Sequence, residues 1–498
     1  MSRIAVIGSG FSGLSAAAYL SAKGYDVHVF EKNDTPGGRA RQLKTDSGYL
    51  FDMGPSWYWM PGIFEKFFND FGYSVTDLYK LKLLDPSFDI VFNKNDTMSI
   101  PAGFSALCDL FESIEEGSSA RLKKFMAEAE YKYKTGMENL VYKPGLSITE
   151  FNDAELIKGA IRLQVFSSFS KHVRKYFSNP KLIALMEFPV LFLGATPEDT
   201  PALYSLMNYA GLKLGTWYPV GGFGKVIDAM KAVAEKNGAV FHFNTEVDKI
   251  EVENNTVKNL IVNEKKIKCD GVIASADYHH VENKLLSPRY RNYSENYWQR
   301  KTFAPSCLIF YIGVNKKIKS LNHHTLFFDE DLSVHSQEIY KQPQWPTKPL
   351  FYVCCPSKSD ENVAPAGHEN IFLLMPLAAG LKDSEEMREK YFTIMMNRLQ
   401  TQTEEEILSN IDFKESYCIN DFVNDYNSYK GNAYGLANTL MQTAILKPSI
   451  RNKKIKNIFY AGQLTVPGPG VPPSIISGQI AATQLMKHLK QTIHEVVV

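Results

Sequence analysis

The spacing of three glycines near the N-terminus constrains the fold more than any other feature of the chain. Gly8, Gly10 and Gly13 stand in the pattern G-x-G-x-x-G, directly after the short apolar, β-branched run 4–7. That run predicts a buried parallel strand, and the alanine-rich residues 12–22 predict the helix that follows it. The first glycine permits a tight turn, the second lets backbone approach a pyrophosphate, and the third lets the helix pack against the strand. The free N–H groups at the helix start would stabilise a diphosphate.

A second predicted strand, residues 26–30, ends at Glu31 and Lys32. Glu31 follows the last glycine by close to the roughly 20 residues expected for a carboxylate that binds a ribose hydroxyl. An acidic residue here, in place of arginine, argues against a ligand with a 2′-phosphate. With Phe11 and Ser12 in the first helical turn and Lys32 beside the ribose, this context predicts a dinucleotide site rather than a glycine-rich turn without a ligand.

Residues 37–41 read Gly-Gly-Arg-Ala-Arg and come directly after the second strand. They resemble the extended fingerprint of FAD-dependent amine oxidases and related glutathione-reductase-like flavoproteins, which favours FAD over NAD. The resemblance implies that Gly38 allows backbone close to the dinucleotide and that Arg39 pairs with phosphate or shapes the site. An ordinary tight turn is the alternative interpretation.

Composition excludes several classes of protein. The chain has 498 residues and a formal net charge of +1, so a nucleic-acid partner is not expected. Its six cysteines show no metal-binding spacing, which predicts reduced apolar residues and no metal. The pairs His279-His280 and His323-His324 also lack metal spacing, and we interpret them as surface histidines. A strand at the very N-terminus and no run of eighteen apolar residues predict a cytoplasmic protein without a signal peptide or a transmembrane helix.

Residues 51–55 read Phe-Asp-Met-Gly-Pro and are followed by Trp57, Tyr58 and Trp59. The first five, including Gly54 and Pro55 as cofactor contacts, resemble the F-D-x-G-P segment of carotenoid desaturases of the bacterial phytoene-desaturase type. The three aromatic residues are interpreted either as an apolar wall facing a long hydrocarbon or as packing against a predicted helix over 63–71.

A second block with the same resemblance lies at residues 215–222, which match the pattern G-x-W-x-P-x-G-G. The resemblance implies that Trp217 and Tyr218 line the substrate channel and that the two glycines precede a helix over 225–236. Upstream, residues 199–201 (Asp-Thr-Pro) predict the start of another helix. Downstream, relatives hold the adenine end of FAD through backbone at the position of Val247.

The third block runs from residue 458 to residue 485. It contains a predicted strand, a proline- and glycine-rich loop, and most of a predicted helix over 474–488. Relatives use this arrangement to hold the flavin diphosphate and ring edge, and the helix dipole would stabilise a reduced, anionic flavin. Gln463 stands where many relatives carry an acid, so its side-chain contact is not carried over by the resemblance. The cofactor contacts that this block predicts are Gly462, Gln463, Gly470, Val471 and Pro472.

The three blocks cover about a quarter of the chain and occur in the order of the carotenoid desaturase family. They imply an α/β fold with a Rossmann-like, glutathione-reductase-like FAD-binding domain and a discontinuous α+β substrate domain. The FAD-binding domain is predicted over residues 1–80, 215–284 and 440–498, and the substrate and membrane-associating domain over 81–214 and 285–439.

The resemblance also implies an activity, the desaturation of an acyclic carotene by hydride transfer from an allylic carbon to FAD, with oxygen or a quinone as the final electron acceptor. A late-stage carotenoid desaturase (for example a 3,4-desaturase), an isomerase or an oxygenase would share all three blocks. A flavin amine oxidase and a non-catalytic prenyl-binding protein are the alternatives from other classes.

No catalytic base stands out in the sequence. Asp153 is the one candidate, and a helix cap explains it equally well. Residues 155–177 predict a helix with interleaved lysines and arginines, which either lies on a membrane surface or presents a solvated face. Since a polyene substrate partitions into a bilayer, the sequence predicts a peripheral protein on the inner face of the cell membrane.

Overall fold

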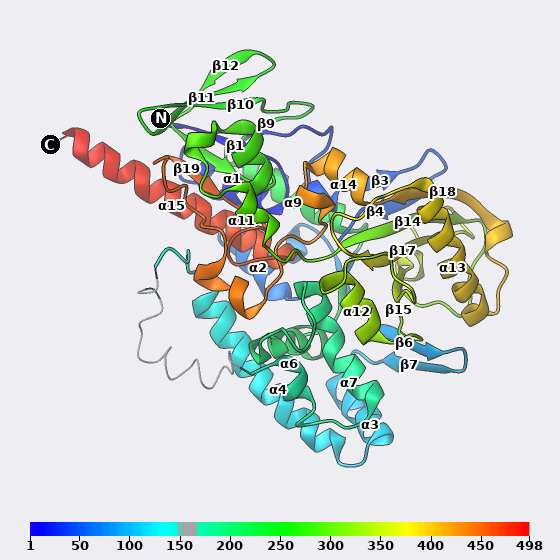
Figure 1. The fold of residues 1–498 in the computed structure, drawn as a ribbon. Helices are drawn as coiled ribbons and strands as arrows, with labels where there is room; N and C mark the ends of the chain where they lie inside the picture. The colour runs from blue at the N-terminus through cyan, green and yellow to red at the C-terminus, as the bar shows by residue number, and fades with distance from the viewer. Residues whose placement is uncertain (148–149, 151–166, 498) are drawn as a thin grey trace.

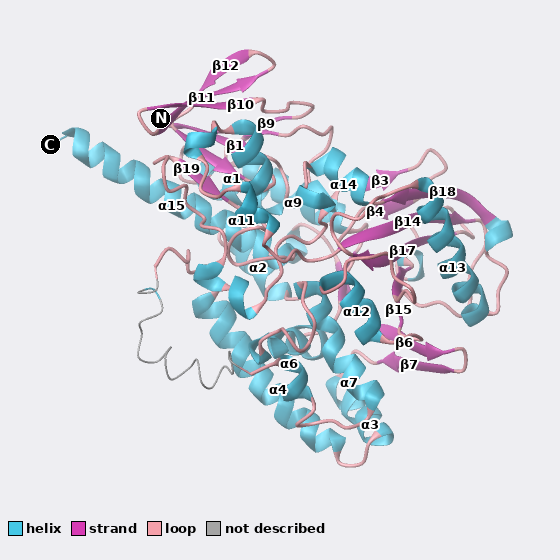
Figure 2. Ribbon diagram, in the orientation of Figure 1, coloured by secondary structure: helices cyan, strands magenta, loops and turns pink. Residues whose placement is uncertain are grey.

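The computed structural model describes residues 1–147, 150 and 167–497 (Figure 1). Within them the fold is α/β, built around two sheets (Figure 2). The first sheet has the order β19-β13-β1-β2-β9, and its paired strands all run parallel. Its strands are β1 (Arg3–Ile7), β2 (Asp26–Phe30), β9 (Val240–His242), β13 (Gly271–Ala274) and β19 (Ile458–Tyr460). Three regions distant in sequence therefore form one sheet.

The helices α1 (Phe11–Ser21) and α15 (Val471–Val497) pack side by side against this sheet. Two glycines allow the close approach. A Cβ on Gly13 would lie 2.0 Å from the carbonyl oxygen of Gly8, and a Cβ on Gly478 would lie 2.2 Å from the carbonyl oxygen of Ser12. The two helices can thus present their N-termini to the same space. Helix α9 (Phe223–Lys236) also contacts α1.

The second sheet has the order β18-β14-β17-β16-β15-β6-β7, with β6 and β15 parallel and the other pairs antiparallel. Strands β14 and β17 are buried almost throughout because α13 (Glu385–Thr403) covers one face of the sheet (Figure 1). The other face turns toward the parallel sheet. The strands are β6 (Phe88–Asn93), β7 (Asp96–Ile100), β14 (Ser306–Val314), β15 (His324–Phe327), β16 (Phe351–Cys354), β17 (Glu369–Leu377) and β18 (Ile411–Tyr417).

Smaller elements complete the described chain. An antiparallel sheet of β10 (Lys249–Glu253), β11 (Thr256–Val262) and β12 (Lys265–Lys268) lies beside the parallel sheet. Two short antiparallel pairs join β3 (Gln42–Lys44) to β4 (Leu50–Asp52) and β5 (Leu81–Leu83) to β8 (Trp217–Pro219). A helical lobe contains α3 (Phe104–Ile114), α4 (Ser118–Thr135), α6 (Phe169–Val173) and α7 (Pro180–Glu187) (Figure 2). The remaining α-helices are α2 (Pro61–Asn69), α8 (Leu206–Asn208), α10 (Tyr278–His280), α11 (Glu295–Gln299), α12 (Leu332–Tyr340) and α14 (Ile419–Tyr426).

Two predicted helices differ from the structure. The helix predicted from Thr200 onward is divided into a 3₁₀ turn, the single α-turn α8 and a π-helical turn at Tyr209–Lys213. Of the helix predicted over 155–177, residues 155–166 lie outside the described residues. In the remainder Ser168 forms a β-bridge with Pro201, so the helix α6 begins only at Phe169. In both places tertiary contacts override the local helical pattern.

Candidate active site

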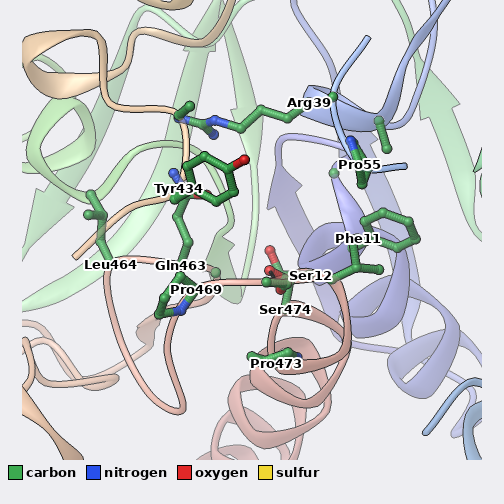
Figure 3. Close-up of a pocket in the computed structure, with 18 of the residues that line it drawn as sticks. Phe11, Ser12, Arg39, Pro55, Tyr434, Gln463, Leu464, Pro469, Pro473 and Ser474 are labelled. Carbon is green, nitrogen blue, oxygen red and sulfur yellow. Dashed lines mark hydrogen bonds between the residues drawn. The ribbon is translucent and has the colours of Figure 1, made fainter. Parts of the chain in front are cut away.

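A cavity of about 1020 Å³ lies between the two sheets. One end is lined by the glycine turn after β1, the end of β2 and the start of α15, and the other by apolar side chains of the second sheet and the helical lobe. Figure 3 shows the first end, where Ser12 lies close to Ser474 and the ring of Phe11 lies on the side of Pro55. The cavity therefore joins the predicted dinucleotide site to an apolar chamber.

The glycine turn leaves room for a diphosphate. Gly8 has φ of +95°, a conformation that glycine adopts readily. A Cβ built on Gly10 meets no protein atom within 4 Å and would project into open space. Helix α1 has no side-chain cap at Gly10 and no acidic residue in its first turn, so its N–H groups are available to an anion. This cradle fits the diphosphate of a dinucleotide.

Glu31 lies at the end of β2 and is 5% exposed. Its Oε2 accepts hydrogen bonds from the backbone N–H and the hydroxyl of Ser9, at 2.8 and 2.7 Å. Its Oε1 accepts from the backbone and side-chain nitrogens of Asn33, both at 3.0 Å. The carboxylate thus stabilises the glycine turn as well as lining the cavity. Lys32 lines the cavity too, and its Nζ donates to the carbonyl oxygen of Asn424 at 2.6 Å.

Arg39 extends across the cavity from the Gly38–Ala40 turn toward Tyr434 (Figure 3). Its Nη2 donates to Ser428 Oγ at 2.9 Å and to the carbonyl oxygen of Asn432 at 3.1 Å. Burial lowers the pKa of this guanidinium, and the nearby Asp277 opposes that shift. A Cβ on Gly54 would lie 2.5 Å from the carbonyl oxygen of Arg39, so the predicted Gly-Pro segment must pass directly beneath it.

The C-terminal block closes the same end of the cavity. The backbone N–H of Gly462 donates to Ser477 Oγ at 2.9 Å, which ties the end of β19 to α15. Ser12 Oγ and Ser275 Oγ lie 2.7 Å apart and link α1 to the end of β13. The lining of the cavity includes the predicted contacts Gly8, Gly10, Phe11, Ser12, Glu31, Lys32, Gly38, Arg39, Gly54, Pro55, Val247, Gly462, Gln463, Gly470, Val471 and Pro472. Gly13 is not part of the lining, since it serves the packing of α1.

The predicted substrate aromatics divide into two groups. Trp57 and Trp59 line the cavity. Tyr58 does not, because its ring stacks on Phe64 at 4.2 Å and its hydroxyl pairs with that of Tyr79 at 2.8 Å. Trp217 and Tyr218, which are predicted to line the channel, are not among the residues that line this cavity.

Both of these residues face other parts of the protein. Trp217 Nε1 donates to the carbonyl oxygen of Leu214 at 2.9 Å, and strand β8 pairs with β5. The hydroxyl of Tyr218 donates to Asp360 at 3.2 Å. The G-x-W-x-P-x-G-G segment therefore serves the scaffold: Gly222 caps α9, and the N–H of Phe223 donates to Asp52 at 2.8 Å.

The apolar chamber comes mainly from residues that sequence reasoning missed. They are spread over the 3₁₀ turn Ala202–Ser205, α8, β15, α12 and the segment after α14, and no local pattern identifies them as a group. Among them are Leu203, Met207, Leu326, Phe328, Tyr340 and Tyr434. Burial raises the pKa of the Tyr340 and Tyr434 hydroxyls, which keeps these groups neutral.

The structure corrects the interpretation of one histidine pair. His323 and His324 are 4% and 0% exposed, so they are not surface histidines. A ring nitrogen of each lies within 4.8 Å of the other and of Cys354 Sγ. The six cysteines are unpaired and buried, as reduced residues would be. Asp153, the candidate base, lies outside the described residues.

Comparisons with known proteins give one consistent family. The profile of the flavin-containing amine oxidoreductases matches residues 11–486. A carotenoid 3,4-desaturase of Haloarcula japonica is 37% identical over 98% of this chain and 98% of its own. A zeta-carotene-forming phytoene desaturase of Myxococcus xanthus is 28% identical over 97% of this chain and 94% of its own. A 4,4′-diapophytoene desaturase of Staphylococcus haemolyticus is 29% identical over 98% and 99%.

Solved structures of low sequence identity share the fold. An oxidoreductase from Methanosarcina mazei matches 97% of this chain and 100% of its own, with a TM-score of 0.62 and 17% identity. Putrescine oxidase bound to putrescine matches 98% and 99%, with a TM-score of 0.61 and 13% identity. Across the described residues, none of the helices combines the length and hydrophobicity that crossing a bilayer requires.

Proposed function

The chain belongs to the flavin-containing amine oxidoreductase family and, within it, to the carotenoid desaturases, and we propose that it desaturates an acyclic, phytoene-like carotene. It is an FAD-dependent oxidoreductase. The observation that carries the choice of substrate is the chamber: an apolar cavity continuous with the dinucleotide cradle accommodates a long hydrocarbon.

FAD, when bound, supplies the hydride acceptor. The chain supplies binding and orientation. The N-termini of α1 and α15 and the open side of Gly10 would hold the diphosphate, while Glu31 would hold the ribose end. The aromatic wall of Trp57 and Trp59 orients a flat polyene and excludes water from the reacting carbons.

A second candidate is the introduction of a late double bond, as in 3,4-desaturation. The relative with that name is 37% identical to this chain, against 28% for the phytoene desaturase of Myxococcus xanthus. Both reactions require the same cofactor geometry and the same apolar chamber. The products distinguish them.

The protein would act at the inner face of the cell membrane, where its substrate resides. Exposed apolar side chains support this: Met441 is 74%, Leu446 44% and Leu146 42% exposed. Both segments that carry them also line the cavity, through Ala444 and Gly145, which pack against each other. Oxygen or a quinone would reoxidise the flavin. We also propose the discontinuous division into an FAD-binding domain (1–80, 215–284 and 440–498) and a substrate domain (81–214 and 285–439).

The test is incubation of the purified protein and FAD with liposomes that carry phytoene, lycopene or a monocyclic carotene, in air and with added quinone. Growth of visible polyene bands from phytoene supports the first proposal, and the band positions count the new double bonds. A red shift only with lycopene or the monocyclic carotene assigns the late reaction. Absence of product from every carotene by a flavin-loaded protein refutes both, and amines then become the substrates to test.

Membrane association is tested separately by co-sedimentation with anionic liposomes. The variant Met441→Asp is expected to weaken binding, because it places a charge where an apolar side chain would enter the bilayer. The matched control is Val423→Asp, a change of an apolar side chain of 41% exposure on α14. Equal binding by both variants and the unchanged protein would contradict this docking face.

A further inference from the structure

Desaturation requires that a proton leave the substrate as well as a hydride. One hydrogen leaves with the electron pair of its C–H bond as a hydride, for which FAD, when bound, would supply the acceptor. The electron pair of a neighbouring C–H bond becomes the new π bond when its proton departs. The reaction therefore needs a proton acceptor in the wall of the cavity and a route from there to solvent.

Most titratable groups in the cavity wall are unsuited to accept this proton, because of their position or their existing hydrogen bonds. The carboxylates Glu31, Glu246, Asp277 and Asp425 lie in the dinucleotide-binding half, beside the glycine turn and Arg39. His335 faces the apolar chamber, but its Nδ1 accepts from the backbone N–H of Leu350 and its Nε2 bonds to the carbonyl oxygen of Pro376, each at 3.0 Å. Both of its ring nitrogens are thus occupied.

Tyr352, on β16, differs from these groups. It lines the cavity, and its hydroxyl lies 2.9 Å from Ser56 Oγ in the segment that follows Gly54 and Pro55. The same hydroxyl lies 2.5 Å from Nδ1 of His324 on the neighbouring strand β15. A tyrosine of the cavity wall is therefore joined through its hydroxyl to a buried base.

The contacts continue outward from His324. Its ring centroid lies 4.4 Å from that of His323, and Nε2 of each ring has no hydrogen-bond partner within the described chain. Since a ring nitrogen of one lies within 4.8 Å of a ring nitrogen of the other, a single water molecule can link them. His323 Nδ1 lies 2.8 Å from Oγ of Ser359, a half-buried residue whose carbonyl oxygen accepts from the exposed Lys82.

From these contacts we infer that Tyr352, His324, His323 and Ser359 form a proton-transfer chain that carries the substrate proton from the cavity to the protein surface. This inference rests on the proposed desaturation. Tyr352 Oη accepts the proton from carbon while its own proton moves to His324 Nδ1. His324 then releases its Nε2 proton toward His323, which releases its Nδ1 proton toward Ser359. The first transfer breaks a C–H bond and forms an O–H bond, and each later transfer breaks one O–H or N–H bond and forms another, so one proton reaches solvent.

The surroundings of the two histidines suit transient protonation. Burial lowers the pKa of His324 well below its usual value, with His323 adding to the shift, and lowers that of His323 to about 3. Both rings are thus neutral at rest and free to accept. The charged groups facing His323 are Lys82 and Asp360. A proton beside a carbocation is far more acidic than an imidazolium, so a weak base suffices.

Stacking supports the charged form of His324 as it passes the proton on. The ring of Trp57 lies parallel to that of His324, with an interplanar angle of 8° and a centroid distance of 4.2 Å. An aromatic face attracts a cation, and the attraction is strongest where water is excluded. Trp57 therefore both lines the cavity and stacks on His324, the first histidine of the proton-transfer chain.

The activity test compares Tyr352→Phe and His324→Gln with two matched controls that lie outside the cavity. Tyr391→Phe removes a buried tyrosine hydroxyl on α13, and His172→Gln replaces a buried histidine on α6. We expect Tyr352→Phe and His324→Gln to lower product formation about 10²-fold or more, the usual contribution of general acid–base catalysis. FAD content and melting temperature should match those of the controls. Turnover of Tyr352→Phe within 2-fold of Tyr391→Phe would overturn the proposal.

An isotope effect separates proton transfer from a purely structural role. With a carotene deuterated at the carbon that loses the proton, the primary isotope effect on product formation should be larger in Tyr352→Phe than in the unchanged protein, because proton loss becomes rate-limiting. An unchanged isotope effect in a slower variant would assign Tyr352 a structural role only.

A measurement that needs no turnover tests the proton-transfer chain even if no carotene is a substrate. With ¹⁵N-labelled histidine, the NMR spectrum should show neutral His324 whose Nδ1 accepts a hydrogen bond, and that signal should shift in Tyr352→Phe but not in Tyr391→Phe. A doubly protonated His324 at neutral pH would overturn the proposal, as would a stoichiometric metal ion that is lost in Cys354→Ser. If the unchanged protein desaturates no carotene, the proposed function is refuted. The NMR spectrum then still tests whether Tyr352 and His324 are hydrogen-bonded as described.

Discussion

Replacing Gly10 by alanine separates the stability of the protein from its affinity for FAD. Gly10 precedes helix α1 with φ of −69° and ψ of 179°, values that alanine adopts without strain. The added Cβ meets no protein atom within 4 Å and points into the cavity. The cofactor-free variant should therefore fold as well as the unchanged protein, within about 0.5 kcal/mol.

The affinity for FAD should fall because the methyl group occupies the space that the diphosphate needs. Overpacking of a closely fitting site typically costs about 1–3 kcal/mol. At about 1.4 kcal/mol for each tenfold change, this corresponds to an increase in Kd of about 5- to 150-fold. Gly13→Ala should act differently, since its Cβ would lie 2.0 Å from the carbonyl oxygen of Gly8 and would destabilise the cofactor-free protein as well.

The assay is titration of cofactor-free protein with FAD, followed by the change in flavin fluorescence, beside urea unfolding of each variant. Gly62→Ala is the matched control, because its Cβ also meets nothing within 4 Å but the residue lies on α2, outside the cavity lining. A folded Gly10→Ala variant with the affinity of Gly62→Ala would refute the placement of the diphosphate against Gly10.

Three further perturbations test the scaffold and the chamber. Burial raises the pKa of Glu282 to about 7, so its contribution to stability is full below pH of about 4.5 and is lost as pH rises to about 7. Between these pH values this loss lowers the free energy of unfolding, measured with urea, by up to about 3 kcal/mol, and Glu282→Gln should abolish it. The same dependence of unfolding free energy on pH in Glu282→Gln and the unchanged protein would contradict this. Gly478→Ala should cost about 3 kcal/mol and weaken FAD binding, because its Cβ would lie 2.2 Å from the carbonyl oxygen of Ser12; a melting temperature equal to that of Gly62→Ala would argue against this close packing. Met207→Trp should lower kcat/KM for a full-length carotene about 10-fold by filling part of the chamber, with unchanged FAD affinity, whereas equal kcat/KM would place the substrate elsewhere.

The grouping of the predicted cofactor contacts around one cavity could be inferred from local patterns. G-x-G-x-x-G, the acid that ends β2, and the proline- and glycine-rich start of α15 each carry a backbone requirement that few other residues meet. These requirements are local, so they can be read from sequence spacing. The structure indeed gathers sixteen of the seventeen predicted contacts around one cavity, and Gly13 alone takes a packing role.

Aromatic residues carried no comparable local signal. Trp57, Tyr58 and Trp59 are adjacent in sequence, yet only the first and third line the cavity, because side chains of extended backbone alternate in direction. Trp217 and Tyr218 followed the family pattern, but their side chains donate to the carbonyl oxygen of Leu214 and to Asp360. Which face of an extended segment meets the cavity depends on its partners.

The sequence by itself determined the nucleotide-binding fold, because the strand, turn and helix of the first block are consecutive and their backbone requirements are met by neighbouring residues. Only the tertiary structure decided the chamber and the contacts of Tyr352, His324, His323 and Ser359. His324 meets Tyr352 because β15 and β16 pair in one register, and His323 meets Ser359 through the loop that follows β16. A register shift by one residue would turn each side chain to the opposite face, so such contacts are decided only when the sheet is assembled.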